Sequence, residues 1–487
     1  MNVRTRIAPS PTGKLHIGTL RTVLFDYALA KKNNGEFVVR IEDTDQNRFV
    51  EGSTEEIYEM LEAYKLIPDE GPICGGDFGP YIQSQRKEIY KKYAEELISK
   101  GFAYYCFLKG EELELLQQNF RGKGFRSPFR DQELGLSKKM IEEGNSYVIR
   151  LKVPNDETIE YEDGLQGKIK FDSNVVSDEI LIKSNGMASY HLAVVVDDFL
   201  MKITHVFRGI EWLSSTPKQV LIHRYLNLKM PPYYHLPVIL DPQGGKLSKR
   251  KGNVSAKQFL IEGYLPEAIL NFLMLLGWSS PEKREFGEKE REVYSLEEFT
   301  NLFDLKDLNK SNAIFNREKL AWFNKEYIKN KSNEELSNIY KEWLEKYSDD
   351  KSLKDYVLND NNLSEKVSLV KERSGLLQDI SDQIKFFYLT PENIDWNVKQ
   401  LSKVKENLES IKKDLYELHS NLGSEPKNWT HEEWEQGIRK IGDKYSAKHG
   451  DIFMVVRIAI VGEPFSPTMF ESLQLLPKEE ILKRLRE

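Results

Sequence analysis

Apolar positions in the first 70 residues alternate between the spacing of a strand and that of a helix. Arg4 to Pro9 is a short β run, and apolar residues then recur at helical spacing up to the stop signal Asn33-Asn34-Gly35: Ile17, Leu20, Leu24, Tyr27 and Ala28. The near-continuous apolar run from Phe37 to Ile41 is typical of a buried parallel strand. Ser53 with Glu56 predicts a capping box at the start of the next helix. This βαβα order predicts an α/β fold with a Rossmann-type doubly wound sheet.

The pattern changes near Gln85, where an amphipathic helix is followed by a charged stretch and short strands such as Tyr147 to Val153 and Gly167 to Phe171. The α/β pattern resumes near Tyr190 with a helix. A strand from Ile203 to Phe207, a helix from Thr216 to Tyr225 and a strand from Leu236 to Leu240 follow it. After Gly252 every strong pattern is helical, and two polar stretches are interpreted as linkers or helix ends: Asn330 to Asp350 and Asn359 to Glu365.

These changes of pattern predict three regions. Residues 1–86 and 187–243 are interpreted as an α/β domain, residues 87–186 as an α+β insertion within it, and the chain after Gly252 as helical, with a helical bundle toward Glu487; the resemblance described below divides this last part into residues 244–325 and 326–487.

Composition narrows the class of protein. The 487 residues carry a net charge of −7 at a pI near 5.8, which argues against non-specific polyanion binding but allows a local basic face. No apolar signal segment opens the chain, and its most apolar run, Ala268 to Trp278, is about half of what spans a bilayer, so we expect a cytoplasmic protein with no membrane partner. The isolated Cys74 and Cys106 supply neither a disulfide framework nor a thiolate zinc site.

Two short segments have the residue types of a nucleotide site. Ser10 to Thr19 joins the first strand to the first helix, where free backbone N–H groups and a positive helix end favour a phosphate; His16 and Thr19 are donors there, and Gly18 lets a base or ribose approach the backbone. Asp241 to Gly252 follows the last strand and bears four cations between glycines, which suits a clamp on the phosphates as pyrophosphate leaves. An ordinary strand–helix junction and a solvated basic loop are the alternatives when each is taken alone.

Together, His16-Ile-Gly-Thr19 and Lys246-Leu-Ser-Lys-Arg250 resemble the paired HIGH and KMSKS signatures of class I aminoacyl-tRNA synthetases, with Thr19 in place of the last His and Leu247 in place of the Met. The flanking segments are similar to those of glutamyl-tRNA synthetases of the bacterial and organellar type: Arg6 to Gly13, Arg40 to Asp45, Tyr190 to Ala193, Val196 to Asp198, Arg208 to Trp212 and Ser215 to Pro217. The resemblance runs from residue 3 to about residue 325 and is weaker beyond.

The resemblance implies a ligase that uses ATP with Mg²⁺ to activate L-glutamate as an adenylate and then transfers it to the terminal adenosine of tRNA-Glu, as a monomer and without zinc. It implies that glutamate binds Arg6, Ala8, Ser10, Glu42, Tyr190 and Arg208, with the arginines at the side-chain carboxylate and Glu42 at the ammonium group. It implies that ATP binds His16, Gly18, Thr19, Glu211, Lys246, Ser248 and Lys249, of which His16, Thr19, Lys246 and Lys249 are the catalytic candidates.

The resemblance also implies that tRNA lies along the other regions. Residues 87–186 would hold the acceptor end, residues 244–325 the stem, and residues 326–487 the anticodon, with Arg373 where members that discriminate against tRNA-Gln keep an arginine. Three alternatives remain open: a non-discriminating enzyme that also charges tRNA-Gln, a glutaminyl-tRNA synthetase, disfavoured by the Pro9-Ser-Pro-Thr-Gly13 segment, and a non-catalytic tRNA-binding protein derived from a synthetase.

Overall fold

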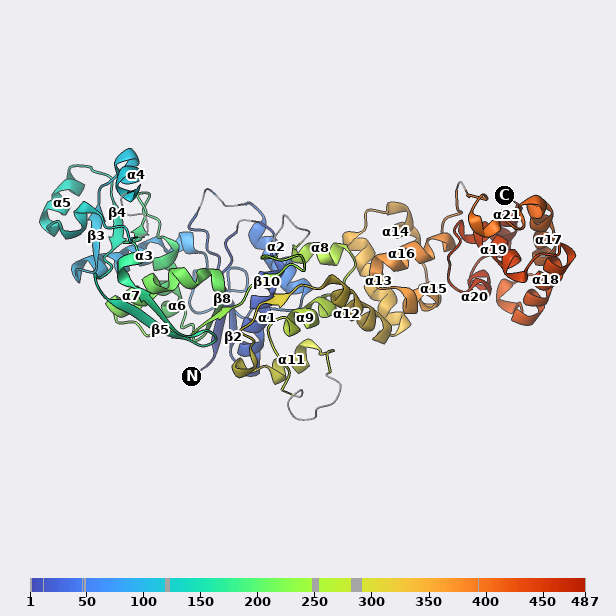
Figure 1. The fold of residues 1–487 in the computed structure, drawn as a ribbon, viewed down its shortest axis with the longest axis horizontal. Helices are drawn as coiled ribbons and strands as arrows, with labels where there is room; N and C mark the ends of the chain where they lie inside the picture. The colour runs from blue at the N-terminus through green and yellow to red at the C-terminus, as the bar shows by residue number, and fades with distance from the viewer. Residues whose placement is uncertain are drawn as a thin grey trace. The chain divides into compact units, whose positions relative to one another are not determined.

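The computed structural model describes residues 2–11, 13–45, 47, 50–118, 123–247, 254–281, 291–392 and 394–486 (Figure 1). The chain divides into two compact units. The first comprises residues 1–258 and 270–316, and the second comprises residues 259–269 and 317–487. Among the described residues, no helix combines the length and the apolar character needed to cross a membrane.

Parallel strands joined by helices form the centre of the first unit. Strand β1 (Arg4–Ile7) pairs with β2 (Glu36–Val39) in the register Arg6 opposite Val38, and α1 (Ile17–Lys32) connects them. Strand β8 (Val206–Gly209) pairs in parallel with β9 (Tyr233–Leu236), and α7 (Thr216–Leu226) connects that pair. The hydrophobic pattern predicts two such βαβ units, but the last strand of the second one lies at Tyr233–Leu236, before the predicted Leu236 to Leu240.

One strand of the predicted insertion pairs with a strand of this α/β framework. Strand β5 (Thr158–Asp163) forms an antiparallel hairpin with β6 (Gly167–Asp172) and also pairs in parallel with β9, where Asp163 lies opposite Tyr233. A separate antiparallel sheet has the order β3 (Ala103–Cys106), β4 (Val148–Leu151) and β7 (Ile180–Ile182). The hairpin therefore extends the sheet of β8 and β9, with the strand order β6-β5-β9-β8.

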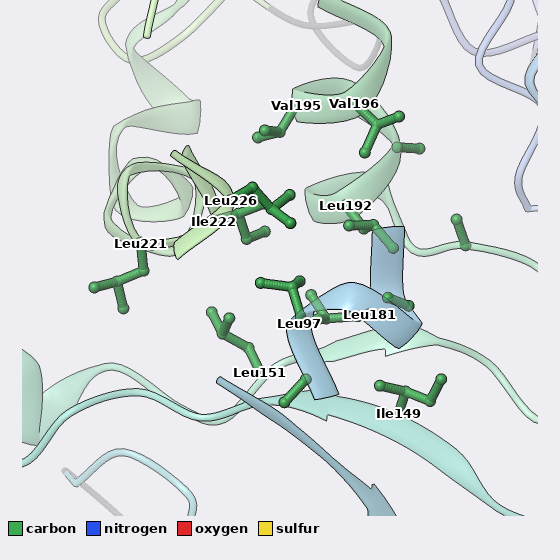
Figure 2. Close-up of a cluster of buried hydrophobic side chains, with 14 of the residues drawn as sticks. Leu97, Ile149, Leu151, Leu181, Leu192, Val195, Val196, Leu221, Ile222 and Leu226 are labelled. Atoms are coloured by element: carbon green, nitrogen blue, oxygen red, sulfur yellow. The ribbon is translucent and has the colours of Figure 1, made fainter. Parts of the chain in front are cut away.

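A hydrophobic core fastens the insertion to the α/β framework. Helices α3 (Lys87–Ser99), α6 (Tyr190–Leu200) and α7 surround it, and β4 and β7 close it, as Figure 2 shows for Leu97, Leu192 and Ile222. These three side chains are fully buried, and each contributes about 1.5–3 kcal/mol by leaving water. Residues on either side of the predicted boundary at 186 thus share one core.

The remaining elements of the first unit are short. Its helices are α2 (Ser53–Ala63), α4 (Gly110–Gln118), α5 (Leu134–Glu142) and α11 (Leu296–Leu302); α8 (Ala256–Ile261) and α9 (Pro266–Leu275) contain residues of both units. Its 3₁₀ turns are η2 (Gln83–Arg86), η3 (Pro128–Asp131), η4 (Ser173–Val175), η5 (Ile210–Ser215) and η7 (Leu305–Asp307).

Two local predictions for the first unit are wrong. Gly52, at a left-handed φ of 78°, caps α2, and the Ser53 hydroxyl donates to the Val50 carbonyl at 2.6 Å, so the predicted Ser53–Glu56 capping box does not form. A strand also follows residue 252, since β10 (Ile239–Leu240) pairs with β11 (Ala313–Ile314). Two-residue strands carry too little alternation to be seen in a sequence.

The described part of the second unit is helical. Its helices are α12 (Arg317–Asn330), α13 (Asn333–Tyr347), α14 (Lys351–Leu358), α15 (Leu363–Val370), α16 (Leu377–Ile384), α17 (Leu408–Asn421), α18 (His431–Lys444), α19 (His449–Val461), α20 (Met469–Gln474) and α21 (Lys478–Arg486). The 3₁₀ turns are η8 (Lys371–Arg373), η9 (Lys385–Phe387), η10 (Lys399–Leu401), η11 (Lys405–Asn407) and η12 (Pro426–Asn428).

The interpretation of residues 330–350 as a linker is wrong. The Ser332 side chain caps α13 by accepting from the Glu335 backbone N–H, and the helix buries a stripe at helical spacing: Leu336, Tyr340, Trp343 and Leu344. The polar residues that suggested a linker lie on the outward face of this helix. Residues 359–362 do separate α14 from α15, as the second polar stretch predicts.

Candidate active site

A cavity of about 680 Å³ opens in the first unit where its parallel strands end. The carboxyl ends of such strands are where α/β folds bind ligands. Of the residues predicted to bind glutamate or ATP, eleven line this cavity: Arg6, Ala8, Ser10, His16, Gly18, Thr19, Glu42, Tyr190, Arg208, Glu211 and Lys246. The other two, Ser248 and Lys249, lie outside the described residues. Segments far apart in the sequence therefore converge on one site.

The His16 turn forms the start of helix α1. His16 is the N-cap, and its Nδ1 accepts the Gly18 backbone N–H at 2.9 Å. A Cβ at Gly18 would lie 3.2 Å from that nitrogen, a tight contact, so the absence of a side chain relieves crowding in the turn and leaves its backbone open to a ligand. The backbone N–H groups of this first turn and the positive end of the helix face an anion favourably.

Arg6 and Glu42 line the cavity and belong to a network of buried side chains in which basic and acidic groups form ion pairs. Arg6, on β1, donates to both carboxylate oxygens of Asp198 at 3.2 and 3.3 Å. The fully buried Arg40 donates to Asp198 at 2.7 Å and to Glu42 at 3.0 Å. Burial would raise the pKa of Asp198, but attraction by Arg6 and Arg40 outweighs it and lowers that pKa. Glu42 differs, since burial dominates over both arginines and raises its pKa.

Arg208, on β8, has a different environment because its hydrogen-bond partners among the described residues are all neutral. Its Nε donates to His235 at 2.9 Å, its Nη1 to Gln219 at 2.8 Å and to the Tyr190 hydroxyl at 3.3 Å, and its Nη2 to Thr216 at 2.8 Å. The guanidinium also lies 4.5 Å from the centroid of the Tyr233 ring. Among the described residues no carboxylate lies within 4 Å of it as an ion pair, so Arg208 presents a buried and uncompensated positive charge.

Lys246 and Glu211 face each other at the mouth of the cavity. The Lys246 Nζ donates to Glu211 Oε1 at 2.8 Å, and both side chains are about half exposed to solvent. Burial opposes ionisation of Glu211, yet the hydrogen bond from Lys246 lowers its pKa overall. Lys246 also forms an isolated antiparallel bridge to Leu240, at the end of β10. The first cation of the basic loop is thus positioned at the cavity.

Several other residues line the cavity without having been predicted as site residues, and Arg21, Lys183 and Trp212 are among them. Arg21 projects from α1 and donates to the carbonyls of Leu276 and Pro237, and burial lowers its pKa to about 10. The Trp212 ring packs 4.7 Å from that of Tyr190. Arg21 lies inside helix α1 and Trp212 inside the Arg208 to Trp212 segment, and neither position by itself assigns a side chain to the cavity. No group of three or more His, Cys, Asp or Glu side chains arranged to hold a metal ion occurs among the described residues.

Comparison with known protein families identifies the family of this chain. Residues 2–322 match the family model described as tRNA synthetases class I (E and Q), catalytic domain, and residues 335–487 match an anticodon binding domain. The chain belongs to the class I tRNA synthetases of the glutamate and glutamine type.

Members of this synthetase family that are similar to the chain over its full length include glutamate–tRNA ligases. The glutamate–tRNA ligase of Finegoldia magna is 40% identical over 507 aligned positions, which cover 100% of this chain and 99% of the relative. That of Chlorobium phaeobacteroides is 39% identical and covers 100% and 97%. The crystal structure of a glutamate tRNA ligase from Elizabethkingia meningosepticum in complex with its amino acid is 35% identical, with a TM-score of 0.83 over 100% of this chain and 98% of that one.

The anticodon domain of this synthetase has a cavity of its own, about 1810 Å³ in volume, within the second unit. Arg373 lines it and donates through Nη1 to the Ser466 carbonyl at 2.6 Å, while Arg457 donates to the Ser466 hydroxyl at 3.0 Å. Burial and the nearby charge of Arg373 lower the pKa of Arg457. Exposed aromatic rings flank these cations, since Phe465 is 81% exposed and Tyr356 53%. Cations beside exposed rings are the elements that bind unstacked bases.

Proposed function

We propose that this protein ligates L-glutamate to tRNA-Glu in two steps, ATP-dependent formation of glutamyl-adenylate and transfer of the glutamyl group to the terminal adenosine. The observation that carries the proposal is that Arg208 has no carboxylate partner among the described residues, whereas Asp198 balances the charge of Arg6 in the same cavity. A buried guanidinium without an anionic partner is unfavourable until a ligand supplies the anion. The side-chain carboxylate of glutamate has the charge and the planar geometry to do so.

The remaining residues of the wall suit the other end of glutamate. Glu42 would accept the α-ammonium group, and the raised pKa of its buried carboxyl would return toward its usual range when a cation arrives. Tyr190 lies within the electrostatic influence of both Arg208 and Glu42, so its ring would lie along the glutamate side chain. Arg6 would add hydrogen bonds, because Asp198 already balances its charge. Ala8 and Ser10 complete the lining.

The His16 turn and the basic loop would hold ATP. The first turn of α1 offers backbone donors, with His16 and Thr19 beside them, and the volume of about 680 Å³ is within the range of sites for ligands of this size. Glu211 and Lys246 lie at the same mouth. Mg²⁺ would arrive with the nucleotide, since it is held largely by phosphates and water and needs few protein carboxylates.

In this reaction the side chains position the substrates and stabilise the negative charge that develops on the leaving group. The glutamate carboxylate attacks the α-phosphorus and pyrophosphate leaves, so negative charge develops on the leaving group. Lys246 and Lys249 would meet that charge, and His16 and Thr19 would orient the phosphates. In the second step the ribose hydroxyl of the terminal adenosine replaces AMP at the glutamyl carbonyl.

The tRNA would follow the regions predicted from the sequence, with its acceptor end on residues 87–186, its stem on residues 244–325 and its anticodon on residues 326–487. The rings and cations around Arg373 support the anticodon assignment. Arg373 would read the third anticodon base, which is C in tRNA-Glu and G in tRNA-Gln. A guanidinium only donates, so it satisfies the two acceptors of C and meets the donors of G unfavourably. We therefore propose a discriminating enzyme.

A charging assay with labelled glutamate tests the function directly. The purified protein should form glutamyl-tRNA on tRNA-Glu, release pyrophosphate in proportion, and charge tRNA-Gln much more slowly. Comparable charging of both tRNAs would identify the non-discriminating alternative. Binding of tRNA without any ATP–pyrophosphate exchange, measured with glutamate and tRNA present, would identify a non-catalytic binding protein and overturn the proposal.

A further inference from the structure

A buried chain of hydrogen bonds lies behind Arg208, on the side away from the cavity. His235, on β9, accepts the Arg208 Nε–H through Nε2 at 2.9 Å, and its Nδ1 bonds to Asp163 Oδ2. Both His235 and Asp163 are buried, and neither lines the cavity. The chain Asp163–His235–Arg208 therefore acts on a substrate only through the arginine.

The geometry fixes where the imidazole carries its proton. Because an arginine nitrogen can only donate, Nε2 must offer a lone pair, and the ring proton must lie on Nδ1, where it donates to the Asp163 carboxylate. Burial lowers the pKa of His235 and outweighs the opposing effect of its hydrogen bond to the Asp163 carboxylate, so the ring stays neutral. Burial opposes ionisation of Asp163 too, but the bonds to His235 and to backbone N–H groups lower its pKa overall.

Asp163 is itself held rigidly. Its Oδ1 accepts the backbone N–H groups of Leu165 at 3.0 Å and Gln166 at 2.8 Å, at the turn between β5 and β6. The Gln166 side chain in turn donates to the His235 carbonyl at 2.9 Å. The hairpin of the predicted insertion thus ends in a set of hydrogen bonds that fixes both the position and the tautomer of His235.

We infer that Asp163 and His235 are positioning residues for glutamate selection, which orient Arg208 and leave its charge available to the substrate carboxylate. A carboxylate bonded directly to Arg208 would hold the guanidinium equally well but would neutralise it and compete with glutamate. The neutral imidazole supplies an acceptor without a charge and keeps the Asp163 carboxylate one ring away from the guanidinium. This inference rests on the proposed function, because it assigns the ligand of Arg208.

Three variants separate this role from simple support of the fold. In Asp163→Asn the amide can donate to Nδ1, which moves the ring proton to Nε2 and sets a donor against the Arg208 Nε–H. In His235→Asn the amide reaches the position of Nδ1 and loses the acceptor for Arg208. In His235→Gln the side-chain oxygen reaches the position of Nε2 and keeps that acceptor. His205→Gln is a control, since His205 is also partly buried in this region and bonds to Thr204 without touching Arg208.

Aminoacylation of tRNA-Glu is measured with glutamate and ATP varied in turn. We expect Asp163→Asn and His235→Asn to raise the KM for glutamate about ten- to a hundredfold, the range for losing one hydrogen bond to a charged group. The KM for ATP should stay within about twofold, and inhibition by glutamine should weaken less than glutamate use. His235→Gln should recover about tenfold of the loss seen in His235→Asn, and His205→Gln should match the unmutated protein.

Equal effects on the KM for glutamate and for ATP, or equal losses in His235→Asn and His235→Gln, would overturn the inference. If the Asn variants fail to fold, the ¹⁵N spectrum of histidine-labelled unmutated protein decides, with His235 identified by its missing signal in His235→Gln. A neutral ring protonated at Nδ1 supports the inference, and one protonated at Nε2 overturns it. An unmutated protein that never charges tRNA with glutamate would instead refute the proposed function.

Discussion

Replacing Arg208 with alanine tests the glutamate pocket most directly. The substitution removes a buried cation that has no carboxylate partner among the described residues, so the glutamate side chain would enter a buried position without the charge of Arg208. Breaking a buried ion pair by removing one partner costs about 3–5 kcal/mol. That range corresponds to a fall of roughly 10²- to 10³-fold or more in kcat/KM for glutamate.

The structure also predicts a different loss for glutamine. The four neutral acceptors around Arg208 lose their donor whichever amino acid binds, so this part of the effect is common to both. In the variant, the neutral side-chain amide of glutamine loses only its hydrogen bonds to a charged donor, which are worth about 1.5–3 kcal/mol. It leaves no charge unpaired. Selectivity for glutamate over glutamine should therefore fall by about tenfold or more.

Steady-state aminoacylation of tRNA-Glu measures this effect, with glutamate varied and glutamine added as a competitor. Arg224→Ala is the matched control, because Arg224 lies on α7 in an exposed ion pair with Glu157 and should alter neither constant appreciably. An equal loss for glutamate and glutamine in Arg208→Ala would refute the reasoning, since it would mean that Arg208 supports the pocket without reading the charge.

Three further predictions concern other parts of the chain. Lys249→Ala, which lies outside the described residues, should lower kcat for adenylate formation about 10²-fold in ATP–pyrophosphate exchange with little change in glutamate binding; a rise in the KM for ATP alone would contradict the clamp role. Arg373→Gln should relax selection toward tRNA-Gln by about 1–3 kcal/mol in the ratio of kcat/KM values for the two tRNAs, and an unchanged ratio would exclude it as the discriminating residue. Burial lowers the pKa of His419 to about 4, and its Nε2 accepts the Trp434 Nε1–H at 3.0 Å. Since the unfolded chain takes up this proton near pH 6.5, stability should fall by about 3 kcal/mol as pH drops from about 6.5 to 4, and urea unfolding of His419→Gln should lack that part of the pH dependence. Identical pH dependence in both proteins would show that His419 is not the group responsible.

The sequence determined those features that depend on local pattern and on motif. The periods of apolar residues predict α1, β2 and α3 within a few residues, because a buried face imposes the same spacing wherever the element lies. The motifs predicted eleven residues that line one cavity, since the turns after parallel strands end at the same edge of a sheet. The local prediction failed at the start of α2, where the Ser53 hydroxyl bonds to the nearby Val50 carbonyl, and at the helix α13, whose buried stripe depends on tertiary packing.

Only the tertiary structure decided which charges in that cavity are already paired. Arg6 and Arg208 are both arginines on parallel strands, and nothing in their sequence neighbourhoods tells that Asp198 neutralises the first while His235 leaves the second charged. Asp163 and His235 are 72 positions apart and sit on strands that pair only because the β5 hairpin adds to the sheet. Electrostatic compensation depends on distances of a few ångströms between side chains, and those distances are set by folding and not by the order of residues.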